Sequence, residues 1–427
     1  MSGWDDNACV SKQSSQNTLN YNWMRFQKCL PYLLPRSSID KSLIIILAFG
    51  DLSHLEACTV LADELLDVQR VEDDVLTVRL KSATDVYENL AGAHKIAIPI
   101  TPVITSLVDG AADVAHFLEY LGDGFNFSVS CYFQGMEDSE YQSMVSTMLS
   151  IVREAGYRRA NLVRSRRGTE IQTKEIMSRN VIDFVVLTVR GQYQIGVTAY
   201  IPETAQFRTR SNERPVVSSE TSVSARIGRV LVNLGGLSKG EVLLDPFCGS
   251  GTILSEAILA GVNCIGVDRN PIRIENTKRN LEWVSSSASR KSVGAYSLIT
   301  GDARNLESLL DGKTPVDAVV TEPILLPKID HAPGLDKARR MVRNASKLYS
   351  DALYSMALVL RSGGRIVMVA PSLRTSANRD VAVEVEELGE IGLKPFRSMK
   401  FSLGYPVRIG HESTKWVRRL IYVFEHV

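Results

Sequence analysis

Length, composition and charge already narrow the class of protein. The chain has 427 residues, of which 44% are hydrophobic and 23% are charged, and its formal net charge is +1. A globular chain of this length is expected to form about three domains, each with its own core. A net charge near zero does not decide whether nucleic acid is a partner, because acidic residues elsewhere can offset a local basic patch.

The cysteine spacing and the short apolar runs exclude several classes of protein. Six cysteines show no C-x-x-C spacing, which argues against a zinc site and for a reducing compartment. No apolar run approaches the ~20 residues needed to span a bilayer, and the polar, acidic N-terminus does not fit a secretory signal. We therefore expect a cytoplasmic protein that binds neither a metal ion nor a membrane.

The first hundred residues divide into two parts. Ser11–Asn20 has almost no apolar content, so residues 1–40 are expected to be a disordered N-terminal extension. Residues 41–100 are predicted to form a small α/β N-terminal domain, with strands near 43–49 and 75–80 and a helix capped by Asp51. His54 and His94 stand alone in the sequence and are expected to be structural.

Residues 101–200 are predicted to form a second α/β domain. Apolar side chains alternate with polar ones from Phe125 to Phe133, the pattern of a strand with one buried face. A helix is expected over 139–155 and a further strand over 183–190.

Basic side chains gather between that helix and that strand. Arginine pairs bidentately with phosphate, and such clusters supply sequence-independent affinity for nucleic acid; Tyr157 and Asn161 would add stacking and polar contacts. A solvated basic loop is the alternative. Residues 201–222 are predicted to be a linker, because Pro202 and Pro215 interrupt regular structure, and its Arg208, Arg210 and Arg214 would extend the basic surface. The predicted RNA-binding residues are Arg158, Arg159, Arg164, Arg166, Arg167, Lys174 and Arg214.

Strands alternate with helices from residue 223 to residue 427. This alternation predicts a mostly parallel, doubly wound sheet. Pro271 suits the first position of a helix over 271–282, and the last strand is expected to join a hairpin at the sheet edge. Strands are predicted near 241–245, 263–267, 295–300, 316–321, 364–369 and 418–425.

The glycine turn after the first of these strands is the feature around which the chain is organised. Val242-Leu243-Leu244 is closed by Asp245, and Gly249-Ser250-Gly251 leads into a helix. Glycine there lets the backbone adopt positive φ and pass close to a ligand, and the helix N-terminus offers unpaired N–H groups. The third glycine of a dinucleotide fingerprint would fall at Leu254, so the usual nucleotide-phosphate signature is absent.

Acidic residues at the ends of the next two strands indicate a nucleoside ligand. Asp268 lies about 20 residues past the glycine turn, where a carboxylate accepts hydrogen bonds from ribose hydroxyls. Asp302 ends the third strand and is placed to accept one from an adenine amine. Ordinary polar loop residues are the alternative. The predicted cofactor-binding residues are Asp245, Phe247, Gly249, Gly251, Asp268 and Asp302.

At this point the sequence resembles a known family. The run D-P-F-C-G-S-G-T from Asp245 to Thr252 resembles motif I of S-adenosylmethionine-dependent amino-methyltransferases. Residues 245–260 are most similar to the tRNA guanosine-10 methyltransferases, and residues 225–234 fit the same family. The resemblance extends, more weakly, from about residue 41 to the C-terminus. It implies an α/β protein that ends in a doubly wound, Rossmann-like methyltransferase domain over 223–427. It also implies a THUMP-like RNA-binding domain over 101–200 and S-adenosyl-L-methionine as the cofactor.

The turn after the fourth strand departs from that family's catalytic turn. The family pattern is Asp or Asn, then Pro-Pro, then an aromatic residue, whereas this chain has Glu322-Pro323-Ile324-Leu325. The acidic side chain and a backbone carbonyl accept the protons of the guanine amine, which directs its lone pair toward the methyl donor. Glu322 and Pro323 are the predicted catalytic residues. The stacking ring is absent at Ile324, and Phe247 or Tyr405 would have to supply it.

The resemblance implies methyl transfer to the 2-amino group of guanosine-10 in tRNA, with tRNA and a small activating protein subunit as partners. Two alternatives remain open. One is a catalytically impaired tRNA-binding module of a modification complex, which the altered turn favours. The other is an amino-methyltransferase that acts on another nucleic acid or on protein.

Overall fold

The computed structural model describes most of the chain from residue 42 onward. The residues outside its description are 1–41, 73, 82–88, 120, 122–123, 133–136, 165–169, 218–222, 288–292, 312–314, 324–325, 327–328, 384–387, 397–405 and 409–415. The predicted N-terminal extension, Arg166, Arg167, Ile324 and Tyr405 therefore lie outside the described residues.

The chain forms two compact units, and each is built from segments that are separated in the sequence. Counting only the described residues, the first unit lies within 42–47, 64–81 and 93–201, and the second lies within 48–63, 89–92 and 202–427. Among the described helices, none is both long and apolar enough to cross a bilayer.

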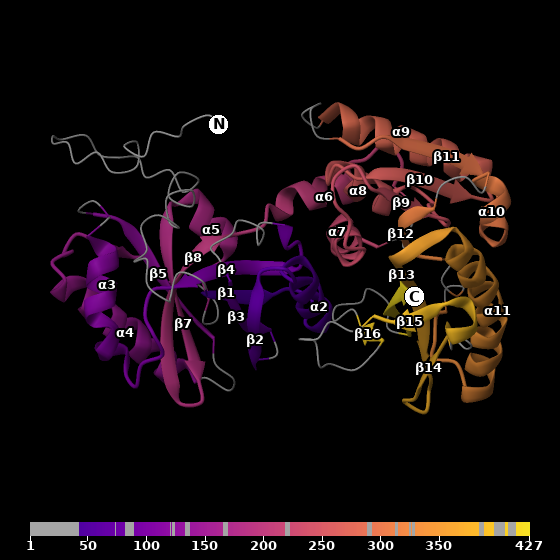
Figure 1. Cartoon of the computed structure of the whole chain (residues 1–427). Coiled ribbons are helices and arrows are strands. Elements are labelled where there is room, and N and C mark those ends of the chain that lie inside the picture. The colour runs from indigo at the N-terminus through magenta and orange to yellow at the C-terminus, as the bar shows by residue number, and fades with distance from the viewer. Residues whose placement is uncertain are drawn as a thin grey trace. The chain divides into compact units, whose positions relative to one another are not determined.

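One mixed sheet runs through the first unit (Figure 1). Within the described residues it has eight strands in the order β2-β3-β1-β4-β8-β7-β5-β6. β5 is parallel to β6 and β7, and the other pairs are antiparallel. Helices α3 and α4 lie side by side next to β5 (Figure 1). The strands are β1 (Ser42–Leu47), β2 (Leu65–Glu72), β3 (Val75–Leu80), β4 (Ala93–Pro99), β5 (Asn126–Tyr132), β6 (Asn161–Leu162), β7 (Val181–Val189) and β8 (Gln192–Tyr200). The helices are α3 (Ala111–Leu118), α4 (Asp138–Glu154) and α5 (Thr173–Ser178), with a 3₁₀ turn at Leu107–Gly110.

This sheet differs from the prediction in two ways. The boundary expected at residue 100 does not separate two sheets, because β4 pairs with β1 on one side and β8 on the other. The helix after β1, α2 (Asp51–Val60), belongs to the second unit. There Glu56 accepts a hydrogen bond from Asn233 Nδ2 at 2.7 Å.

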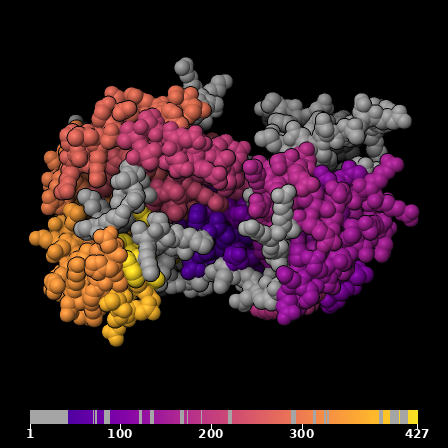
Figure 2. Space-filling view, turned by 180° about the vertical axis from the view of Figure 1, so that it is seen from behind, coloured from indigo at the N-terminus to yellow at the C-terminus, as the bar shows by residue number. Residues whose placement is uncertain are grey.

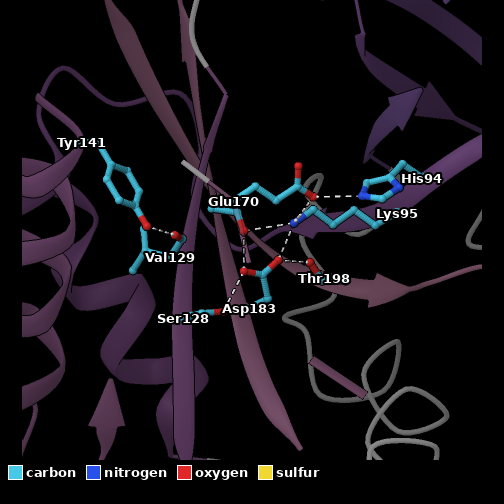
Figure 3. Close-up of polar contacts among 9 residues, drawn as sticks. His94, Lys95, Ser128, Val129, Tyr141, Glu170, Asp183 and Thr198 are labelled. Atoms are coloured by element: carbon cyan, nitrogen blue, oxygen red, sulfur yellow. Dashed lines mark hydrogen bonds and ion pairs between the residues drawn. The ribbon is translucent and has the colours of Figure 1, made fainter. Parts of the chain in front are cut away.

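The strand β5 is buried on both faces, and not on one as its alternation predicted. Ser128 and Ser130, on its polar face, are 1% and 0% exposed. Both hydroxyls donate to Asp183 Oδ1 of β7, at 2.9 and 2.7 Å, while Lys95 Nζ and Thr198 Oγ1 donate to Asp183 Oδ2, each at 2.7 Å (Figure 3). Polar side chains are tolerated in this core because each finds a partner.

The second unit is a doubly wound sheet, as predicted (Figure 1). The strand order is β11-β10-β9-β12-β13-β17-β15 among the described residues, with β14 paired to β13 and β16 to β17. The first five strands are parallel and β17 is antiparallel. The strands are β9 (Val242–Asp245), β10 (Asn263–Asp268), β11 (Tyr296–Thr300), β12 (Val316–Thr321), β13 (Leu360–Arg374), β14 (Asp380–Ala382), β15 (Leu393–Pro395), β16 (Val407–Arg408) and β17 (Val417–His426).

All six strands predicted for this unit are present. The final strand, β17, does not lie at the edge, however. It pairs with β13 on one side and with β15 and β16 on the other. The expected linker also contains a helix, α6. The helices are α6 (Thr204–Asn212), α7 (Ala225–Leu234), α8 (Thr252–Leu259), α9 (Pro271–Ser287), α10 (Leu306–Leu309) and α11 (Leu335–Val359), with 3₁₀ turns at Ala303–Asn305 and Leu388–Ile391.

The sheet has a separate hydrophobic core on each face. On β12, Val320 packs in the core shared with α7, α8 and α9, while Val319 packs in the core shared with α11. In the space-filling view, the rose-to-orange atoms of the described residues between 202 and 310 lie above the orange-to-gold atoms of residues 335–383 (Figure 2). Because helices cover both faces, the carboxyl ends of the parallel strands remain the open edge where ligands bind in such sheets.

Candidate active site

The glycine turn lies at that open edge. Gly249 and Gly251 have φ of 56° and 78°, a left-handed conformation that favours glycine. A Cβ on Gly251 would lie 2.8 Å from Cγ2 of Thr277, whereas a Cβ on Gly249 would meet nothing nearer than the Phe247 carbonyl oxygen at 3.8 Å. The missing side chain of Gly249 therefore leaves open space beside the turn.

That space is part of a cavity of about 560 Å³ in the second unit. Its lining includes five of the six predicted cofactor-binding residues, and Gly251 is the exception. Both predicted catalytic residues line it as well. The predicted residues in its wall are Asp245, Phe247, Gly249, Asp268, Asp302, Glu322 and Pro323. A cavity of this size, with acidic groups at successive strand ends, fits a nucleoside cofactor.

Asp268 ties the end of β10 to the glycine turn. Its Oδ2 accepts from the Gly249 amide at 3.2 Å, and its Oδ1 accepts from the Asn270 amide at 2.9 Å. The guanidinium of Arg273 lies 3.7 Å from Oδ2. Each carboxylate oxygen can accept more than one hydrogen bond, so a carboxylate held in this way still has capacity for ribose hydroxyls.

Asp302 is held by its neighbour Arg304. The Arg304 Nε and Nη2 donate to the two carboxylate oxygens at 3.0 and 2.7 Å. This charge-assisted pair lowers the pKa of Asp302 to about 2, so the side chain is an acceptor throughout the physiological range.

Asp245 is buried where β9 ends. Its Oδ1 accepts from the Thr321 hydroxyl at 2.6 Å and from the Phe247 amide at 3.2 Å. Burial raises the pKa of Asp245 to about 7, and the charges of Asp268 and Glu322 add to that increase.

Glu322 follows β12 and is nearly buried. Its Oε1 accepts from Arg419 Nε at 2.7 Å, and its Oε2 accepts from the Val223 amide at 2.9 Å. Burial raises the pKa of Glu322, while Arg419 acts in the opposite direction. The carboxylate therefore reaches the cavity wall with one partner on each oxygen.

Two polar residues of α9 complete the turn and were not predicted as site residues. The Thr277 hydroxyl donates to the Gly249 carbonyl at 2.8 Å. The side-chain amide of Asn280 donates to the carbonyls of Ser250 and Val216, each at 2.9 Å. Both side chains are completely buried. A threonine and an asparagine three positions apart on the apolar face of the predicted helix are the signal that could have identified them.

Arg214 does not lie on an exposed basic surface. It is 7% exposed, and its Nη1 donates to the Thr252 hydroxyl at 2.6 Å, at the start of α8. Arg210 is also used internally, in a two-point contact with the buried Glu256 at 2.6 and 2.9 Å. These two arginines attach the segment around α6 to α8, so the predicted extension of the basic surface through Arg210 and Arg214 is wrong.

The other predicted RNA-binding residues belong to the first unit. Arg158, Arg159, Arg164 and Lys174 are exposed, and Arg164 donates to Gln142 at 2.5 Å. Tyr157 is not free to stack on a base, because its hydroxyl donates to the Leu118 carbonyl at 2.6 Å and its ring packs on Phe125. The Asn161 amide donates to Asn126 Oδ1.

The described residues contain no group of three or more His, Cys, Asp or Glu side chains that could hold a metal ion. Cys248 lines the cavity, but burial raises the pKa of its thiol, which keeps it protonated. His94 pairs with Glu170 at 3.2 Å (Figure 3), and His331 is exposed.

Comparisons with known proteins place similarity in both units. Residues 213–380 match the family described as RMKL-like, methyltransferase domain. The tRNA (guanine(10)-N2)-dimethyltransferase of Methanothermobacter thermautotrophicus is 28% identical over 328 residues, which cover 75% of this chain and 85% of that protein. The enzyme of the same name from Pyrococcus abyssi is 32% identical over 167 residues, 39% of this chain and 44% of its own length. The crystal structure of TrmN from Thermus thermophilus aligns with a TM-score of 0.47 and 15% identity, covering 90% of this chain and 100% of that one.

Proposed function

We propose that this protein moves a methyl group from S-adenosylmethionine to the 2-amino group of a guanosine in tRNA. The match of residues 213–380 to the family described as RMKL-like, methyltransferase domain, supports methyl transfer. Guanosine-10 is the proposed position, which the names of the relatives support. The observation that carries the proposal is that one cavity gathers the acidic strand ends and the Glu322-Pro323 turn.

The cofactor side of the cavity is assigned first. We propose that Gly249 passes beside the cofactor, that Asp268 binds its ribose and that Asp302 accepts from its adenine. Gly251, which lies against Thr277 and not in the cavity wall, would support the turn. Asp245 and Phe247 would border the methionine end. When bound, S-adenosylmethionine supplies an electrophilic methyl group on a positively charged sulfur.

The remaining chemistry belongs to the residues around Glu322. A guanine amine is a weak nucleophile, since its lone pair is delocalised into the ring. A carboxylate and the Pro323 carbonyl that accept its two hydrogens direct the lone pair into the cavity. Such positioning can supply a large part of a rate enhancement, and a misplacement of ~1 Å can cost ~100-fold in rate.

The RNA side of the proposal rests on the first unit. Arg158, Arg159, Arg164 and Lys174 are exposed cations that suit contacts with phosphates. Arg166 and Arg167 remain part of this proposal, although they lie outside the described residues. We also propose a cytoplasmic location and a small activating subunit; methylation that begins only when a second protein is added would support that subunit.

The experiment is methyl transfer from labelled S-adenosylmethionine to unmodified tRNA transcripts, followed by digestion and identification of the nucleosides by mass. The expected product is a guanosine with one or two methyl groups on its 2-amino nitrogen. Glu322→Gln should lower the yield at least tenfold, because an amide can accept through only one of its two head-group atoms. No product from a preparation that binds both cofactor and tRNA would favour a tRNA-binding module, and product on DNA or protein would favour another substrate.

A further inference from the structure

Arg419 reaches the candidate catalytic turn from a strand that comes almost one hundred residues later. On the parallel pair β12 and β13, Thr321 lies opposite Met368. β13 continues past the end of β12 to Pro371, which lies opposite Arg419 on β17. The sheet register therefore brings the Arg419 side chain beyond the end of β12, where Glu322 is located.

The contact between Arg419 and Glu322 is close and largely shielded from solvent. Arg419 Nε lies 2.7 Å from Glu322 Oε1, and the two side chains are 11% and 9% exposed. The Val223 amide occupies the other carboxylate oxygen at 2.9 Å. An ion pair shielded from water in this way fixes both partners more strongly than a surface pair does.

We propose that Arg419 is a positioning residue for amine methylation, which holds the carboxylate of Glu322 in the orientation that accepts a hydrogen from the substrate amine. This inference rests on the proposed function. Glutamate is one methylene longer than the aspartate of the related turn and has one more rotatable bond. Two fixed contacts, one on each oxygen, compensate for that freedom.

The pair also sets the form in which Glu322 acts. The reaction forms a bond between the amine nitrogen and the methyl carbon, breaks the carbon–sulfur bond and leaves its electron pair on sulfur. The nitrogen must then release one proton, which the ionised carboxylate can take. A protonated Glu322 would instead donate a hydrogen bond and could not accept that proton.

Among the described charged or titratable groups around Glu322, Arg419 is the one that favours the ionised carboxylate. Asp245 on β9 and Tyr349 on α11 are the titratable side chains whose pKa values the Glu322 charge raises. Neither offers a positive charge, and burial already opposes ionisation of Glu322. Arg419 is therefore the group that offsets the cost of burying this carboxylate.

The test compares Arg419→Gln and Arg419→Lys with the wild-type protein over pH 6–9. We expect the single-turnover rate of Arg419→Gln on a tRNA transcript to fall at least tenfold at pH 7 and to recover partly at pH 9. The single-turnover rate of Arg419→Lys should lie between those of Arg419→Gln and the wild type. Arg418→Gln is the matched control, because Arg418 pairs instead with Asp380 at 3.1 Å; its profile should follow the wild type.

A second readout does not depend on activity. Carbon-13 spectra of protein labelled at the glutamate carboxyl carbons, with Glu322 assigned through Glu322→Gln, report its ionisation directly. Glu322 should ionise at least one pH unit higher in Arg419→Gln, while the affinity for S-adenosylhomocysteine stays within about twofold. The inference would be overturned if Glu322 had the same pKa in both proteins. An unchanged pH profile of the rate, or a faster Arg419→Gln variant, would also overturn it. A wild-type protein that methylates nothing, with the expected ionisation shift, would instead contradict the proposed function alone.

Discussion

The hydroxyl of Thr321, at the end of β12, donates a 2.6 Å hydrogen bond to Asp245 at the end of β9. This bond joins the strand that carries the glycine turn to the strand that carries the Glu322 turn. It also stabilises the ionised form of a carboxyl group whose pKa burial raises to about 7.

Thr321→Val should therefore shift cofactor binding along the pH scale. If Asp245 borders the methionine end, its negative charge attracts the cofactor ammonium, and affinity should fall as pH drops through 7. Loss of the Thr321 hydroxyl raises the pKa of Asp245 further, so the fall should occur at higher pH. Calorimetric titration with S-adenosylmethionine between pH 6 and 8.5 measures this. Thr147→Val on α4 is the control, because the Thr147 hydroxyl donates to the Ser143 carbonyl of its own helix. Coincident curves for all three proteins would argue against the assignment.

Asp268→Ala should weaken cofactor binding more than tenfold. The substitution removes the proposed ribose acceptor and also releases the Gly249 and Asn270 amides. Equilibrium binding of S-adenosylhomocysteine is the measurement, and Asp336→Ala, an exposed carboxylate on α11, should bind like the wild type. If Asp268→Ala bound S-adenosylhomocysteine as tightly as the wild type, the assignment of this cavity as the cofactor site would be wrong.

Glu56 should make the second unit less stable as pH rises. Its carboxylate is completely buried, and burial raises its pKa from 4.5 to about 7 even though Asn233 and two backbone amides donate to it. A raised carboxyl pKa means that the folded state binds the proton more tightly. The associated stability is complete below pH 4.5 and is lost as pH increases through 7, by up to about 3 kcal/mol at ~1.4 kcal/mol per unit.

Urea unfolding of the wild type and Glu56→Gln between pH 5 and 8 tests this. Glu56→Gln should be less stable at pH 5, because its amide group meets backbone donors, and its stability should change less with pH. Parallel pH dependences would show that Glu56 does not titrate in this range.

Arg158→Gln combined with Arg159→Gln should reduce the salt dependence of tRNA binding. If each arginine neutralises one phosphate, the slope of log K against log salt should fall by about 1.5. Filter binding at several salt concentrations gives the slope. The control is Arg79→Gln with Arg190→Gln, which removes two exposed charges of the same unit, one on β3 and one after β7. A slope that both double variants share would favour the solvated-loop interpretation.

The strands and the acidic ends of the second unit were predictable because parallel strands are nearly continuous apolar runs and glycine turns are rare. Asp245, Asp268 and Asp302 could be brought together from sequence alone, since carboxyl ends of parallel strands share one edge. The role of Arg419 could not be predicted, because the contact depends on the register of β17 with β13.

The first unit was harder to interpret for a related reason. Ser128 and Ser130 look like an exposed strand face until Asp183 and Lys95 are placed opposite them. Likewise, nothing local shows that Arg214 is buried against Thr252 or that α2 packs with the second unit. Each of these depends on partners that are distant in sequence.

The most direct test of the central claim compares two tRNA transcripts that differ by a single exocyclic amine. One carries guanosine at position 10 and the other carries inosine there, which lacks the 2-amino group. We expect methyl incorporation into the guanosine-10 transcript and none into the inosine-10 transcript, with equal binding of both. Equal incorporation into the two transcripts, or none into guanosine-10 despite bound cofactor and tRNA, would contradict it.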